Sequence, residues 1–441
     1  MAWWRTLAVG LAAALLAGSE LEAITPWHWQ RLPVGDWAVA EGGAVCARCD
    51  GPSATYHNPA GLTRLSQPTI SGSAQVIEYT RIATRAEGGV AIADELQLKP
   101  NSVGFASGGR ELAWSLLLAS PLAWNAAMEM RTQSGAGRRR DDARSSLEFM
   151  VGGLGLGLAG SSFGRLGLSL EVWLVSYRHD AGSSLQEADR ALSASLSEWG
   201  RQGALRAALG WQQTRGDWQW GVLLRSPGWA VLNDGAVRST HLAVDRSGAT
   251  LSAIDTACEF AVPLPAQAVL GLAWLPSALP GFELEADLAL HAGSAERQVF
   301  PALAGSTQRV GASAAPFFVP ARTLDLRAIA SPRGGLRYRL PDDALGWPLT
   351  LHAGGWIEPT PVDRSTVFTA LDLLGGSLGA STERGPLRFT LCVSYLTNGT
   401  LRDAIGYLRT PQAGFAPSLA DPAAEVAVRS FLLTLASVYR F

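Results

Sequence analysis

The stretch FELEADLALH at residues 282–291 decides the fold, because it alternates strictly between two kinds of side chain. One set is apolar and the other is mainly acidic: Phe282, Leu284, Ala286, Leu288 and Leu290 against Glu283, Glu285, Asp287, Ala289 and His291. A period of two residues indicates a β-strand with two unlike faces. The alternation recurs in Arg165–Arg178 and in Leu387–Leu396, which predicts a fold built from such strands.

The length of these strands separates two all-β architectures. Strands of soluble sandwiches usually run about 5 to 6 residues, whereas a tilted strand that crosses a bilayer needs about 9 to 11. The alternating segments reach the second length, so their apolar face would meet lipid and their polar face would line a lumen. We therefore predict an all-β fold, a transmembrane antiparallel β-barrel of about fourteen strands. The stretches 226–265 and 292–332 are ambiguous and are candidates for long extracellular loops.

The composition agrees with a Gly-rich and aromatic-rich β-protein. Charged residues make up 17% of the chain, below the usual quarter, while glycine occurs 48 times and tryptophan 16 times. The net charge is -2 and no long basic block occurs, so nucleic acid is not expected as a partner. Beyond the N-terminal segment, no uninterrupted apolar run is long enough for a membrane helix.

Residues 1–23 are expected to be a secretory signal peptide. Arg5 precedes the apolar stretch 7–17, and the segment ends in Leu21-Glu22-Ala23, a small-residue cleavage site. The alternative is an uncleaved anchor, but the apolar stretch is short for one, since a membrane helix needs about 20 residues. The segment indicates export from the cytoplasm.

The C-terminus carries a second targeting pattern. Alternate residues share one face and end in an aromatic terminal residue: Phe431, Leu433, Leu435, Ser437, Tyr439 and Phe441. This arrangement resembles the terminal strand that the outer-membrane barrel assembly machinery reads. The alternative is a buried last strand of a soluble sandwich. We expect the assembly machinery to recognise Phe441.

Residues 42–62, GGAVCARCDGPSATYHNPAGL, resemble the hatch segment of the FadL-like transporters of hydrophobic compounds. In that family, a small-residue helical stretch, an acidic turn and an aromatic residue precede an Asn-Pro-Ala-Gly motif, here Asn58, Pro59, Ala60 and Gly61. Other stretches are also similar to the family, namely 220–227, 264–267, 284–287 and the final strand. His57, Cys46 and Cys49 depart from the family's usual residues.

The resemblance implies a division into the signal peptide, a small helical hatch at 24–66 and a β-barrel at 67–441. The hatch would plug the lumen, and a solute captured among the outer loops would pass after the hatch rearranges and leave sideways into the bilayer. The resemblance also implies a monomer in the outer membrane that binds long-chain fatty acids or aromatic hydrocarbons. The alternative is a non-transporting barrel of the same fold that assembles or shuttles surface proteins.

Two glycine motifs could suggest catalysis but fit strands better. Residues 155–160 match the dinucleotide fingerprint without the βαβ unit it needs, and residues 160–164 match a nucleophile elbow but join two strand patterns. In the strand interpretation Gly153, Gly155 and Gly157 face inward, which leaves lumen space or room for the hatch. No histidine lies in a recognisable catalytic context, so we do not expect an enzyme.

The cysteines and the lumen charges complete the candidate sites. Cys46 and Cys49 are expected to form a disulfide within the hatch, with free thiols as the alternative. Cys258 and Cys392 stand alone, so no zinc site, other metal or cofactor is predicted. Cys392 falls on a lumen face, where it could pack against the plug. Arg165 and Arg388, also on lumen faces, are candidates to bind the carboxylate head group of a solute.

Overall fold

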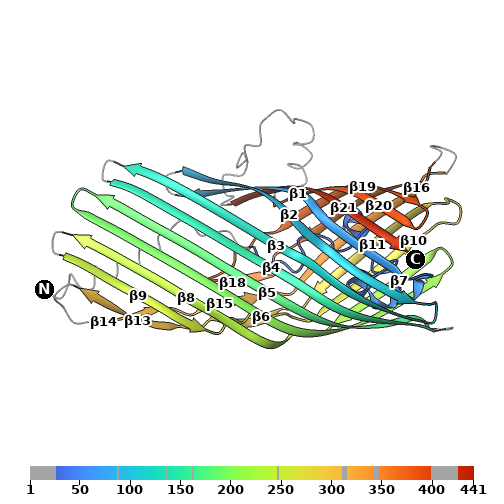
Figure 1. Cartoon of the computed structure of the whole chain (residues 1–441), viewed down its shortest axis with the longest axis horizontal. Helices are drawn as coiled ribbons and strands as arrows, with labels where there is room; N and C mark the ends of the chain where they lie inside the picture. The colour runs from blue at the N-terminus through green and yellow to red at the C-terminus, as the bar shows by residue number, and fades with distance from the viewer. Residues whose placement is uncertain are drawn as a thin grey trace.

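The chain folds into a closed antiparallel β-barrel that holds its N-terminal segment inside (Figure 1). The computed structural model describes residues 26–86, 89–134, 137–160, 163–245, 248–309, 315–341, 347–398 and 426–441. The predicted signal peptide at 1–23 lies outside these residues. Three short helical turns, η1 (Ala38–Glu41), α2 (Ala54–His57) and η2 (Pro59–Arg64), precede the first strand.

The barrel wall contains eighteen strand segments in the described residues. The segments are β1 (Thr69–Ala86), β2 (Gly89–Gly108), β3 (Leu112–Ser134), β4 (Gly137–Gly160), β5 (Gly164–Glu187), β6 (Arg190–Arg215), β7 (Trp218–Arg225), β8 (Trp229–Asp245), β9 (Gly248–Cys258), β10 (Gln267–Trp274), β11 (Phe282–His291), β13 (Leu303–Arg309), β14 (Ala315–Val319), β16 (Ile329–Arg339), β17 (Leu349–Glu358), β19 (Leu373–Arg384), β20 (Leu387–Thr397) and β21 (Val426–Arg440).

Four wall positions are each built from two of these segments, which gives the fourteen strands that the sequence predicted. The divided positions are β7 with β8, β9 with β10, β11 with β13, and β14 with β16. The C-terminal strand β21 pairs with β1 in antiparallel register, from Thr69 opposite Arg440 to Thr84 opposite Val426. This pairing closes the barrel and removes the exposed sheet edges that promote aggregation.

The outer face of the barrel carries a narrow apolar band. On β5 the outward residues are exposed leucines and a valine: Leu166, Leu168, Leu170, Val172 and Leu174. Farther along the same face come Arg178 and Asp180, which pair with each other at 2.7 Å. A band of about nine residues has the height of a bilayer's hydrocarbon core. Within the described residues, no helix is both long enough and apolar enough to cross a bilayer.

The inward face of the same strands is polar at the hatch end. On β11, Leu284, Leu288 and Leu290 are exposed, whereas Glu285 and Asp287 are buried against the hatch. The alternation that predicted the strand therefore distinguishes the outside of the barrel from its lumen. The glycine motifs are also strand features, since 155–160 lies in β4 and Gly160 pairs with Gly164 across the β4–β5 hairpin.

The two ambiguous stretches are not loops, which corrects that part of the prediction. Residues 226–265 contain β8 and β9, and residues 292–332 contain β13, β14 and the start of β16. They also contain β12 (Ser294–Phe300) and β15 (Arg322–Leu326), which join β18 (Val362–Ser365) in a separate three-stranded sheet. The alternation in 292–332 was unclear because most of its strands are short, such as β14 with 5 residues. In both stretches apolar residues such as Val237, Ile254 and Phe300 are buried toward the lumen, which blurs the contrast between the two faces.

Candidate functional site

We call the N-terminal segment, over its described residues 26–66, the hatch. It fills one end of the lumen, which we call the hatch end. Every residue from Pro26 to Cys49 is buried. The turns η1, α2 and η2 alternate with tight bends, and Gly42, Gly43 and Gly51 adopt positive φ angles there. Such short helical turns cannot be stable alone, so their conformation depends on the surrounding wall.

Asn58 connects two parts of the hatch to the barrel wall. Its Oδ1 accepts a hydrogen bond from Ala60 N at 3.2 Å, which caps η2. Its Nδ2 donates to Cys46 O at 2.9 Å, to Trp211 O on β6 at 3.0 Å, and to Val222 O on β7 at 3.3 Å. Pro59 then occupies the first position of η2, where a missing N–H costs nothing.

Inward-facing glycines of the wall make room for this motif. A β-carbon on Gly157 would lie 3.0 Å from Pro59 O, and one on Gly210 would collide with Asn58 Oδ1. The predicted room for the hatch along β4 is confirmed, because Gly153 and Gly155 would meet Thr55 in the same way. Without side chains, these wall positions let the hatch backbone pack directly on the strands.

The acidic face of β11 holds the neighbouring hatch segment. Asp287 Oδ2 accepts hydrogen bonds from Val45 N and Cys46 N, both at 2.9 Å, and Glu285 Oε1 accepts one from Ala47 N at 2.6 Å. Consecutive backbone N–H groups thus point at two buried carboxylates. The carboxylate of Glu285 is also paired with Arg48, so its bond from Ala47 N is charge-assisted, and such bonds are about twice as strong as neutral ones.

Arg48 forms the centre of a buried ionic cluster. Its guanidinium lies 2.6 Å from carboxylate oxygens of Glu41, Glu283 and Glu285. Glu41 also contacts Arg337 on β16 at 2.9 Å and His352 on β17 at 2.7 Å. Burial alone would raise the pKa of Glu41, but the nearby cations lower it to about 2. Glu41 is therefore ionised at neutral pH.

Further ion pairs connect the hatch to the wall on other sides. Arg31 pairs with Glu78 on β1 at 2.5 Å, and Asp36 pairs with Arg388 on β20 at 2.6 Å. Of the two predicted head-group ligands, Arg388 is thus occupied by the hatch itself. Arg165 is partly exposed and lies near Arg64. Burial is the main cause that lowers the pKa of Arg64, and the positive charge of Arg165 lowers this pKa further. The structure does not bring the two candidates together.

The expected disulfide between Cys46 and Cys49 is not formed, and both thiols are free and buried. The two side chains have different partners, since Cys46 Sγ lies 3.9 Å from Val269 O and Cys49 Sγ donates to Asn58 O at 3.4 Å. Burial raises the pKa of both thiols well above the ordinary value. Cys392 packs against Val39 and Ala40 of the hatch, as its lumen position predicted.

Next to the hatch, the lumen contains an aromatic cluster that was not predicted from the sequence, and one of its members, Trp27, belongs to the hatch. It consists of Trp27, Phe149, Trp173, Tyr177, Phe260, Phe300 and Phe368. The rings pack closely, with Trp27 and Phe149 centroids 5.0 Å apart and Tyr177 stacked on Phe260 at 5.8 Å. A signal was present in β5, where Trp173 and Tyr177 interrupt the polar face. Phe260 and Phe300 lay in the stretches of unclear pattern.

The wall beside this cluster is incompletely paired. Residues 229–234 of β8 pair with β6 but not with β9 or β10 on their other side, because segment 259–266 leaves the wall and turns inward. Gln202 holds this inner segment through both backbone groups of Val262, at 2.6 and 3.0 Å. Trp229, Val231 and Leu232 are more than half exposed next to the interruption.

Solved structures of other proteins share this architecture. No protein-family model matches the sequence, and no curated protein matches it. Similar solved structures include a FadL homologue of Pseudomonas aeruginosa, at 11% identity and a TM-score of 0.60 over 94% of this chain and 100% of that chain. The toluene transporter TodX of Pseudomonas putida matches at 14% identity and 0.60 over 93% of this chain and 100% of its own. The toluene transporter TbuX of Ralstonia pickettii matches at 14% and 0.55 over 93% and 98%. The resemblance deduced from the hatch motif is confirmed at the level of the fold.

Proposed function

The chain has the fold of the FadL-like transporters, and on that premise we propose that it is an outer-membrane channel for hydrophobic small molecules. The aromatic cluster carries the proposal. Barrel lumens are ordinarily polar and filled with water, whereas here Trp27, Phe149 and Phe260 are fully buried inside the barrel. An apolar solute that leaves water for such surroundings gains about 25 cal/mol for each Å² buried, so capture needs no energy source.

Two parts of the cluster differ in how easily they can move. Phe149 and Trp173 belong to the continuous wall strands β4 and β5, whereas Phe260 and Phe368 lie outside the strands. A solute can therefore take the place of Phe260 and Phe368 without breaking wall hydrogen bonds. We propose that segment 259–266 moves when a solute enters, and that the solute leaves through the adjacent interruption beside residues 229–234.

For such a path, the hatch must keep the hatch end of the lumen closed. Its cation–carboxylate contacts, centred on Arg48 and Glu41, hold it in the lumen, and a cavity between the hatch and the wall has a volume of about 20 Å³. That space accommodates about one water molecule. We propose that rearrangement of Asn58–Gly61 and the neighbouring turns controls passage toward the hatch end.

Monoaromatic hydrocarbons are the first solutes to test, with long-chain fatty acids second. The edge-to-face ring contacts of the cluster suit a planar aromatic guest, and two of the similar structures are described as toluene transporters. A fatty acid would need a cation for its carboxylate, and Arg388 is already paired with Asp36. We also propose that Phe441, 58% exposed at the C-terminus, is read during outer-membrane assembly.

Uptake of labelled toluene and oleate by a deletion strain tests the proposal. The strain should regain uptake with the wild-type gene, lose most of it with Phe260→Asp, which places a carboxylate in the apolar cluster, and keep it with the matched outward variant Leu168→Met. Growth on each compound as sole carbon source supplies a second readout. If deleting the whole gene leaves uptake of both solutes unchanged, the protein is not their channel.

One observation favours the non-transporting alternative, a barrel that assembles surface proteins. The aromatic side chains of the cluster pack on one another and on Trp27 of the hatch, whose ring centroid lies 5.0 Å from that of Phe149. An assembly role predicts that the cluster is a permanent core. In that case Phe260→Ala would leave a cavity and lower stability by about 3 to 5 kcal/mol, and a surface protein would disappear from the deletion strain while solute uptake stayed normal.

A further inference from the structure

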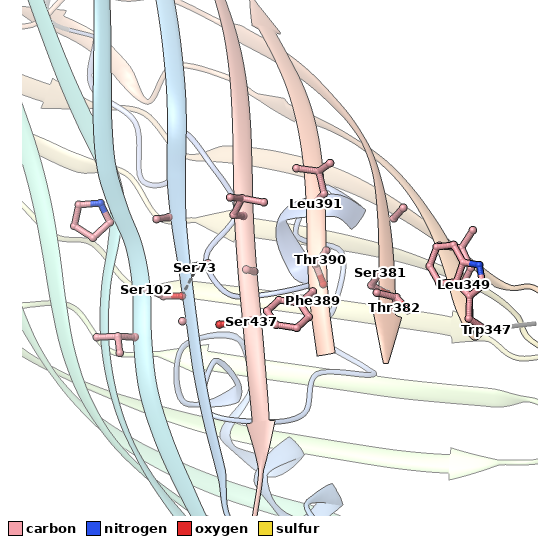
Figure 2. Close-up of a pocket in the computed structure, with 17 residues that line it drawn as sticks. Ser73, Ser102, Trp347, Leu349, Ser381, Thr382, Phe389, Thr390, Leu391 and Ser437 are labelled. Carbon is pink, nitrogen blue, oxygen red and sulfur yellow. Dashed lines mark hydrogen bonds between the residues drawn. The ribbon is translucent and has the colours of Figure 1, made fainter. Parts of the chain in front are cut away.

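A hollow of about 700 Å³ lies on the outer face of the wall, near the hatch end. It crosses β1, β2, β17, β19, β20 and β21, around the seam that closes the barrel (Figure 2). Its outward residues Val103, Phe389, Leu391 and Leu435 are each about half exposed. The buried Ser73 and Ser102 belong to the same strands but point inward, where their hydroxyl groups hydrogen-bond each other at 2.8 Å.

Small residues at neighbouring register positions create the hollow. Gly72 pairs with Ser437, and Ser437 pairs in turn with Phe389, so a glycine and a serine lie side by side between larger side chains. Next to them β1 is bulged between Gln75 and Ile77. A bulge and a missing side chain both bend a strand locally and open space beside it.

The polarity of the hollow changes in order along the strands. Arg384 is exposed at the β19–β20 turn, two residues from Thr382 on the same face, which is roughly 7 Å on an extended strand. The next level holds the hydroxyl group of Ser437 and, on the neighbouring strand, the ring of Phe389. Thr382 lies beside Phe389, and its hydroxyl group donates to Pro348 O at 2.8 Å. Farther from the turn the lining becomes apolar, with Leu391 and Leu435. From the rim inward, a cation is followed by a level that holds a hydroxyl group and an aromatic ring, and then by aliphatic side chains.

We propose that this hollow binds one membrane glycerophospholipid. The phosphate would contact Arg384, an ester oxygen would accept a hydrogen bond from Ser437, and one acyl chain would cover Leu391 and Leu435. The order of these chemical groups matches the order of the lining. The inference rests on the membrane location in the proposed function, but not on transport, because the hollow is outside the wall and the proposed solute path is inside it.

The position of the hollow favours a phospholipid over the transported solute. Tyr439 and Phe441 lie at the same end of β21, and their rings contact each other at 4.9 Å. Exposed aromatic side chains gather where acyl chains meet headgroups. A hydrocarbon solute has no polar group for Arg384 or for the hydroxyl group of Ser437. The site would also strengthen the β1–β21 seam, because a lipid bridges strands from the two ends of the chain.

Native mass spectrometry of the full-length protein in detergent, titrated with palmitoyl-oleoyl phosphatidylglycerol, tests the site. Gly72→Leu fills the hollow without a clash, since a β-carbon there meets only Ser102 O at 3.9 Å. The matched control is Gly152→Leu on β4, where a β-carbon meets only Leu118 Cδ2 at 3.5 Å. We expect wild type and control to hold one tight lipid, and Gly72→Leu to bind it about tenfold more weakly.

Arg384→Gln is a second variant and does not depend on filling the hollow. It should weaken binding several-fold and remove most of the salt dependence, because it removes the phosphate contact. Equal lipid affinity of wild type, Gly72→Leu and Arg384→Gln would overturn the site, as would displacement of the lipid by toluene at the concentrations that are transported. If the lipid binds as expected while toluene uptake is absent, the transport function fails and the lipid site stands.

Discussion

Arg48 Nε lies 2.6 Å from Glu285 Oε2, so a hatch cation is held by the strand whose alternation identified the barrel. The outward residues of β11 are apolar, and its inward residues Glu283, Glu285 and Asp287 bind the hatch. One strand thus separates lipid from lumen and positions the plug. The strength of this contact determines how readily the hatch can move.

Replacing Arg48 should release the hatch. Arg48→Met removes the cation paired with Glu285, and an uncompensated buried carboxylate costs about 3 to 5 kcal/mol. We expect higher ion conductance in planar bilayers and a lower thermal midpoint. Arg178→Met is the control, because its exposed pair with Asp180 contributes at most about 1 kcal/mol. Equal conductance of wild type and Arg48→Met would contradict the role of the cluster.

A side chain at Gly210 should displace Asn58 from its hydrogen-bonded position and open the plug. The β-carbon of Gly210→Ala would collide with Asn58 Oδ1. Overpacking of this kind costs about 1 to 3 kcal/mol, which the hatch can relieve by leaving the wall. Sensitivity to a large antibiotic should rise in cells that express Gly210→Ala, and Gly152→Ala, which faces outward, should leave it unchanged.

The closed hatch should lose stability in acid. The pKa of Glu41 is lowered from an ordinary value of 4.5 to about 2 in the folded state. The released state therefore binds more protons between these values, so closure gains stability as pH rises through this window and loses it as pH falls. Conductance should increase from pH 5 to pH 2, and this dependence should flatten in Glu41→Gln. A pH-independent wild type would refute the assignment.

Both hatch thiols should be unreactive in the closed protein. Burial raises the pKa of Cys46 and Cys49, and a thiol that stays protonated is a poor nucleophile. Maleimide should label neither residue in detergent without denaturant and both after unfolding. Arg48→Met should label faster than wild type, because its hatch is released. An intact mass that reveals a disulfide in freshly purified protein would contradict the free thiols.

A disulfide across the wall interruption should stop lateral exit. Gly228 N donates to Leu264 O at 2.7 Å, which brings β8 and the inner segment together. A β-carbon on Gly228 would lie 2.8 Å from that of Leu264, so the inner segment must shift by about 1 Å to reach the spacing of a disulfide. In Gly228→Cys/Leu264→Cys, oxidation should reduce toluene uptake strongly and a reductant should restore it, because the segment can no longer move farther. Each single-cysteine variant is a control, because it cannot form the disulfide. Full uptake by the oxidised double variant would place the exit elsewhere.

Sequence alone determined the features that depend on local periodicity. The alternation in 282–291 and 165–178 specified long two-faced strands, and the terminal pattern around Phe431 and Tyr439 predicted the outward face of β21. The inward glycines of β4 were also predictable, because parity alone places Gly153 and Gly155 in the lumen. These conclusions require only that a strand alternates its side chains.

The tertiary structure decided which groups meet inside the barrel. Arg48 and Glu285 are far apart in sequence, and no local pattern reports their contact. Cys46 and Cys49 have a spacing that permits a disulfide, but the wall and the η2 turn draw their thiols to separate partners. Phe260 became a lumen residue only because its segment left the wall. Periodicity assigns a face to each residue, whereas closure of the barrel selects its partners.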